Sequence, residues 1–162
     1  MNNLTASVGV KRFALRIAQL LGMIWTLPNT LVGLAVGAVG VMAGGHVHWR
    51  QQDLALVFHN LPWGPGGALT LGNVILYTGQ DIDSHCFTYE HRAGLRKDPV
   101  IVLSRHERAH VYQYMVLGPL FLPVYAICGG VSHRNRFEQA ADYYAVLGRG
   151  WFPWPRKVSL MS

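Results

Sequence analysis

His106-Glu107-Arg108-Ala109-His110 is the stretch of this 162-residue chain that decides its fold. Residues four apart lie on one face of an α-helix, so both imidazoles of this stretch can reach one metal ion. Glu107 follows the first histidine and can take a proton from a water that the metal polarises. A catalytic zinc site usually has three protein ligands and one open position. The sequence must therefore supply a third ligand.

The best candidate for the third ligand is Glu138, which opens a second expected helix. It follows His110 by 28 residues, a connection long enough for the chain to turn back. Asp142 lies four residues further on, on the same helical face, and can accept the spare N–H of a ligand histidine to fix its tautomer. Three further residues are candidate donors to a developing oxyanion: His133, Tyr143 and Tyr144.

Each of these residues also has a simpler interpretation. Ser104 and Glu107 are spaced as in a capping box, in which Glu107 would only cap its helix. Glu138 taken alone would be a solvated helix residue. His133 is a rival third ligand, and its simpler interpretation is an exposed loop histidine. The remaining histidines have no paired spacing beyond His46-x-His48 and are expected to be structural or on the surface: His46, His48, His59, His85 and His91.

HERAH (106–110) followed by EQAAD (138–142) resembles the gluzincin arrangement, H-E-x-x-H and then E-x-x-x-D. The E-x-x-A-D form is most similar to membrane-bound zinc endopeptidases such as the CaaX prenyl protease and heat-shock membrane protease group. The resemblance covers residues 100–145, and this chain is much shorter, so the substrate class does not carry over. The resemblance implies one zinc ion held by three ligands, with a general base and a supporting carboxylate: His106, His110 and Glu138; Glu107; and Asp142.

The compact layout is closer to minimal gluzincin domains, in which a strand, the motif helix and the glutamate helix form the core. In such domains an edge strand beside the cleft binds extended peptide, and residues 69–77 would fill that role here. The resemblance thus implies a zinc-dependent metallopeptidase acting on peptides or proteins, membrane-associated ones included. Two alternatives stay open: a non-catalytic, zinc-stabilised membrane protein acting as an assembly or interaction factor, and a small membrane protein without a metal.

The region before the motif domain is uncharged over a long tract. No Asp, Glu, Lys or Arg lies between Ile17 and Trp49. The apolar part, residues 20–43, is long enough to span a bilayer, which needs about 20 residues. Lys11, Arg12 and Arg16 precede it, and the positive-inside rule then places the N-terminus in the cytoplasm. We therefore expect a protein of the bacterial inner membrane, with the side of the catalytic domain open.

Pro28 and Asn29 interrupt this tract and can kink one helix or turn a hairpin. Two full spans need about 40 residues, so a single kinked span, or an interfacial helix followed by a span, is preferred. Small residues recur through the tract. They form either a close helix-packing face or simply the glycine content typical of spanning helices: Gly33, Gly37, Gly40 and Gly44.

Composition supports a membrane partner over nucleic acid. The net charge is +6 and only 14% of residues are charged, below the roughly 25% of a soluble domain. The deficit falls in the uncharged tract, and the basic residues are scattered with no nucleic-acid motif. We expect the lipid bilayer and no nucleic acid as partners, with the oligomeric state undetermined. Cys86 and Cys128 either form one bridge or are free thiols.

These features predict an α+β fold, mostly α, with an N-terminal transmembrane helix and a minimal zincin-like domain of short β-strands, motif helix and glutamate helix. The domain organisation is a basic segment over 1–16, a membrane segment over 17–45 and the zincin-like metallopeptidase domain over 46–162. The expected elements are a strand over 68–77, a motif helix over 100–117, a buried or membrane-surface segment over 115–131 and a helix over 137–147. The aromatic and basic tail, residues 151–157, suits a membrane interface or packing on the domain.

Overall fold

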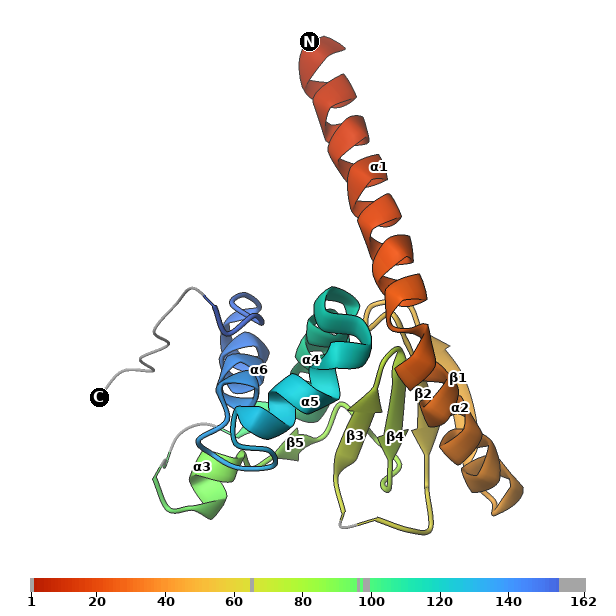
Figure 1. Ribbon diagram of the computed structural model, residues 1–162, viewed down its shortest axis with the longest axis vertical. Coiled ribbons are helices and arrows are strands. Elements are labelled where there is room, and N and C mark those ends of the chain that lie inside the picture. The colour runs from red at the N-terminus through yellow and green to blue at the C-terminus, as the bar shows by residue number, and fades with distance from the viewer. Residues whose placement is uncertain (1, 65, 96, 98–99, 155–162) are drawn as a thin grey trace.

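The computed structural model describes residues 2–64, 66–95, 97 and 100–154. About half of the chain is helical, and a small sheet gives a mixed α and β fold. Helix α1 (Asn2–Trp25) extends away from the body, which consists of the sheet with helices on both sides (Figure 1). The mixture of helices and short strands that the sequence predicts is therefore present.

The N-terminal tract forms two helices. α1 is followed after Thr26 by α2 (Leu27–Met42), with Pro28 in the first turn, where its missing N–H costs nothing. Among the described residues, no single helix is long and apolar enough to cross a membrane; the portion of α1 from Gly9 and α2 meet the length and composition of a span only as a pair bent by 67°. The transmembrane helix stays a prediction.

Four strands form the main sheet in the order β1-β2-β4-β3: β1 (His46–Arg50), β2 (Ala55–His59), β3 (Ala68–Leu71) and β4 (Val74–Tyr77). β2 and β4 are parallel, and the two outer pairs are antiparallel. The single strand expected over 68–77 is thus wrong: the chain reverses at Gly72 and Asn73. Gly72 has φ of 64°, which glycine adopts without a Cβ clash, and Asn73 donates to the carbonyl of Leu54 at 2.7 Å.

Helix α2 lies against one face of this sheet. Its buried residues are the three glycines Gly33, Gly37 and Gly40. A Cβ on Gly33 would meet Val74 at 2.8 Å, and one on Gly37 would meet the ring of Phe58 at 2.6 Å. Three glycines of the small-residue stripe therefore pack within the same chain, whereas Gly44 lies after the end of α2 with open space around it. α2 packs on the sheet as part of the body of the protein, although the sequence analysis predicted residues 17–45 as a separate membrane segment.

The other face of the sheet packs against the motif helix, α4 (Leu103–Leu117). Val57 of β2 and Ile75 of β4 join Val111 of α4 in one buried cluster. α4 begins at Leu103 and not at residue 100 because β6 (Ile101–Val102) pairs with β5 (His85–Cys86). The remaining elements are α3 (Tyr89–Arg92), the 3-10 helix η1 (Gly118–Leu120), α5 (Phe121–Ile127) and α6 (Arg136–Leu147).

The end of the motif helix is tied to the bend between α1 and α2. Gly118 ends α4 with φ of 56°, and a Cβ there would overlap the indole of Trp25. Asn29 of α2 donates from Nδ2 to the carbonyl of Gly118 at 3.0 Å. The two N-terminal helices and α4 are therefore parts of one packed unit.

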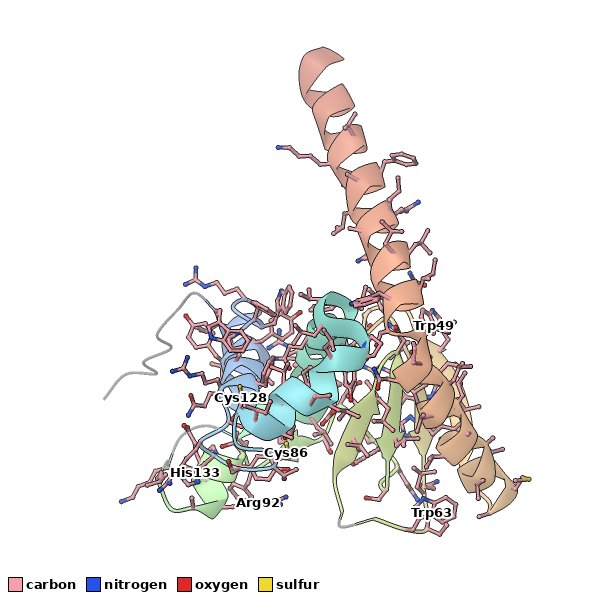
Figure 2. The ribbon with its side chains drawn as sticks, viewed as in Figure 1. Trp49, Trp63, Cys86, Arg92, Cys128 and His133 are labelled. Carbon is pink, nitrogen blue, oxygen red and sulfur yellow. The ribbon has the colours of Figure 1, made fainter. Side chains whose placement is uncertain are left out.

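The described part of the C-terminal tail packs on the domain. Trp151 stacks edge-on against Tyr112 at 5.6 Å, and Trp154 against Phe137 at 5.3 Å. Residues 155–157 of the expected interfacial tail lie outside the described residues. Cys86 and Cys128 are both free and half-buried, so the bridge that the sequence left open is not formed (Figure 2).

Candidate metal centre

Helix α4 turns His106, Glu107 and His110 toward the interior, where all three are buried. No side chain caps the start of this helix. Ser104 instead donates its hydroxyl to Asp83 at 2.5 Å. The capping-box interpretation of Glu107 is therefore wrong: strand β6 sets the start of the helix, and the Glu107 carboxylate faces the site.

Helix α6 brings Glu138 to the two histidines. The Nε2 atoms of His106 and His110 lie 3.0 Å apart. Glu138 places Oε2 3.2 Å from Nε2 of His106 and Oε1 3.4 Å from Nε2 of His110. One possible ligand atom from each of the three residues lies within 4.8 Å of the other two. Among the described residues, this is the one His/Cys/Asp/Glu group with such spacing. His₂Glu is a ligand set of catalytic zinc, so the donor chemistry fits that metal.

The electrostatics of this group favour a cation. Burial disfavours the charged form of His106, but its hydrogen bond to Asp142 and the adjacent carboxylate of Glu138 outweigh burial and raise its pKa well above the ordinary value. Burial likewise opposes the charge of Glu138, yet His110 and His106 hold the pKa of that carboxyl well below its usual range. Oε2 of Glu138 is buried without a hydrogen-bond partner. The cluster thus holds an unsatisfied acceptor where positive charge is stabilised.

Both ligand histidines are fixed from behind through Nδ1. His106 shares a 2.8 Å hydrogen bond with Oδ1 of Asp142, the contact expected from the sequence. His110 shares one of 2.8 Å with Oε1 of Gln113. The amide of Gln113 donates in turn to the carbonyls of Phe137 and Trp151, at 3.2 and 2.7 Å. These bonds leave both Nε2 atoms facing Glu138, the orientation that a metal ligand needs.

Gln113 was missed by the sequence analysis. Its signal was available, because it lies three residues after His110 and so shares its helical face.

Glu107 borders a cleft between α4 and the sheet edge. Its Oε2 accepts a hydrogen bond of 2.6 Å from the hydroxyl of Thr70 on β3. The cleft holds about 200 Å³ and is lined by both histidines, Glu107, Glu138 and residues of β3 and α5. A smaller hollow of about 90 Å³ shares His106 and Glu107 with this cleft and is also lined by Cys86 and Arg92, which are labelled in Figure 2. Thr70 carried no sequence signal, since it is distant from the motif along the chain.

Tyr125 of α5 is a further residue that the sequence analysis missed. Its hydroxyl donates to Oε1 of Glu138 at 2.5 Å. Burial and the nearby Glu138 raise its pKa well above the ordinary value, so the hydroxyl stays protonated and remains a donor. Tyr125 also lines the cleft, which makes it better placed than the donors that the sequence suggested.

Those suggested donors lie elsewhere: none of His133, Tyr143 and Tyr144 is among the described residues that line the cleft. Tyr144 packs against Tyr112 at 5.9 Å, and Tyr143 lies beside Gly150. The reason is helical geometry, because residues one and two positions after Asp142 leave its face of α6. His133 lies in the connection before α6 and offers its carbonyl to Gln139.

Comparison with known proteins found no match to this chain, whether with protein-family models, with curated proteins or with solved structures. The chemistry of the site rests on its own geometry.

Proposed function

We propose that this protein is a membrane-attached, zinc-dependent metallopeptidase. The observation that carries the proposal is the buried group of His106, His110 and Glu138 with Glu107 beside it at the wall of a cleft. A carboxylate that lies beside a set of metal-ligand side chains and borders a cleft is the arrangement that zinc-assisted hydrolysis of a peptide bond uses.

His106, His110 and Glu138 would hold the zinc ion. When bound there, zinc supplies Lewis acidity, which polarises a substrate carbonyl and lowers the pKa of water to about 7. Glu107 is the base that removes a proton from water in the cleft and returns it to the leaving amine. Thr70 holds the Glu107 carboxylate in place through its 2.6 Å hydrogen bond. Tyr125 supplies a protonated hydroxyl at the same wall.

Strand β3 offers a place for an extended substrate. It ends the sheet order, so only β4 pairs with it in the described structure. Ala68, Leu69 and Thr70 of this strand line the cleft beside Glu107, and Leu69 is exposed. A peptide that pairs with the free edge would pass the metal group with its backbone held by main-chain hydrogen bonds. The edge strand predicted over residues 69–77 is therefore shorter in the structure. Only β3 lies at the edge, because β4 lies between β2 and β3.

The test compares detergent-purified wild type with Glu107→Gln and the matched control Glu90→Gln. Each is assayed for zinc content and for cleavage of a mixed fluorogenic peptide library. We expect wild type and Glu90→Gln to bind zinc and cleave, and Glu107→Gln to bind zinc and fail to cleave. Cleavage that survives in Glu107→Gln would refute the role of Glu107. Zinc binding with no cleavage by wild type would favour the non-catalytic assembly or interaction factor.

A further inference from the structure

The outer surface of the two N-terminal helices is apolar and has no partner in the described structure. On α1, the residues at helical spacing on the side away from the body are exposed to 67%, 42%, 59% and 68%: Phe13, Ile17, Leu20 and Ile24. On α2, the face opposite the buried glycines carries residues exposed to 56%, 50% and 80%: Leu31, Val39 and Met42. We call these seven residues the outer apolar face.

Charge beside this face has a single sign. Lys11, Arg12 and Arg16 lie on α1, off the line of Phe13, Ile17 and Leu20, whereas the first acidic residue of the whole chain is Asp53. A helix with basic residues on one side and large apolar residues on the other binds in the plane of an anionic membrane surface. Another copy of the chain would present the same cations to the same cations, which disfavours self-association through α1.

The packing of α2 decides how deep this pair can enter. Gly33 and Gly37 seat α2 directly on strands β2 and β4. If α2 crossed the bilayer, the sheet would be drawn in with it, including the edge strand β1, whose residues are mostly exposed. Open sheet edges exposed to lipid do not occur in the hydrocarbon region, and polar side chains are costly there. α2 therefore does not stand upright in a membrane.

α1 is also too short on its own. Its uncharged portion runs from Ile17 to Trp25, nine residues that rise about 14 Å, whereas the hydrocarbon core is about 30 Å thick. Its bend of 67° from α2 turns it away from the line that a continuous span would need.

From these observations we infer that α1 and α2 form an in-plane membrane seat: a bent pair that lies on an anionic lipid surface with the outer apolar face in the acyl boundary and the cations at the headgroups. Both chain ends then lie on the same side of the membrane. The inference stands apart from the peptidase activity, because it uses no residue of the metal centre.

The first experiment measures binding of the full chain to phosphatidylcholine vesicles with and without phosphatidylglycerol. It compares three proteins. They are wild type, a double variant that carries both Leu31→Glu and Val39→Glu, and a control double variant that adds the same charges at two exposed leucines outside this face, Leu95→Glu and Leu147→Glu. Removing two aliphatic side chains from the acyl boundary should weaken partition roughly 100-fold, while the control binds as wild type does. Binding should also strengthen with phosphatidylglycerol. Equal binding by both double variants, or no preference for anionic vesicles, would overturn the inference.

The second experiment locates the chain ends, with protease-cleavable tags at both termini of the membrane-bound protein in sealed vesicles. Cleavage of both tags from one side, with release of the protein by alkaline carbonate, is expected. Tags on opposite sides would show that the pair crosses the bilayer. The inference would also be overturned if wild type were a dimer without lipid and the double variant Leu31→Glu and Val39→Glu were a monomer. That result would assign the outer apolar face to a second copy of the chain. Using Glu107→Gln as the parent protein separates both readouts from hydrolysis.

Discussion

Replacing Asp142 by Asn isolates the charge behind a metal ligand. Asn keeps the size of the side chain and an oxygen that can accept from Nδ1 of His106, a contact of 2.8 Å, but it removes the negative charge. A hydrogen bond to a charged group is worth about 1.5–3 kcal/mol and a neutral one about 1 kcal/mol. The substitution therefore removes about 0.5–2 kcal/mol, which corresponds to a roughly 2- to 30-fold higher Kd for zinc.

The assay is competition of the purified protein with a chromophoric chelator, which reports the zinc Kd directly. Asp53→Asn is the matched control, because Asp53 is also fully buried and accepts from Arg108 of the same helix at 2.6 Å. The control should lower the free energy of unfolding and leave the zinc Kd unchanged. If Asp142→Asn binds zinc as tightly as wild type, or if both variants lose affinity equally, His106 does not act as a ligand tuned by Asp142.

Two further outcomes follow from packing and from titration. Gly37→Ala places a Cβ 2.6 Å from the ring of Phe58, so urea unfolding should show a free energy of unfolding lower by about 1–3 kcal/mol. The control Gly9→Ala has open space around the new Cβ and should not lower this free energy. Equal behaviour of the two variants would contradict the packing of α2. In protein freed of metal by a chelator, the lowered pKa of Glu138 stabilises the fold at pH values above 4.5, the ordinary pKa of this group. The raised pKa of His106 stabilises the fold at pH values below 6.5, the ordinary pKa of histidine. Urea midpoints should therefore peak between these values and fall as pH rises through the folded pKa of His106 or falls through that of Glu138; a midpoint that keeps rising at alkaline pH would contradict the ion pairs.

The local parts of the site were predictable because helical periodicity fixes them. His106 and His110 had to share a face of one helix, and Glu138 and Asp142 a face of another. Their meeting in space depends on how α6 returns to α4, which spacing only permits. Thr70 could not be found from the sequence, because nothing near it in the chain signals that β3 lies beside α4.

The fold was harder to predict where an apolar run served two elements. Residues 68–77 are uncharged and mostly apolar, and the turn at Gly72 is hidden because glycine also occurs within strands. The uncharged tract suggested a span because composition records length and polarity, not partners. What covers α2 on one side is the sheet, through contacts of Gly33 with Val74 and Gly37 with Phe58, and these arise only in the folded chain.

The seating of α2 on the sheet changes what a shortened protein would be. Removing everything up to Met42 would look like trimming a leader from an intact catalytic domain, yet it would uncover one side of the sheet: Phe58, Leu61, Val74 and Leu76. Exposing four such side chains forfeits about 6–12 kcal/mol, which is comparable to the whole stability of an ordinary domain, about 5–15 kcal/mol. The N-terminal segment is thus scaffold for the residues that follow it, and a truncated protein would aggregate before its chemistry could be assayed.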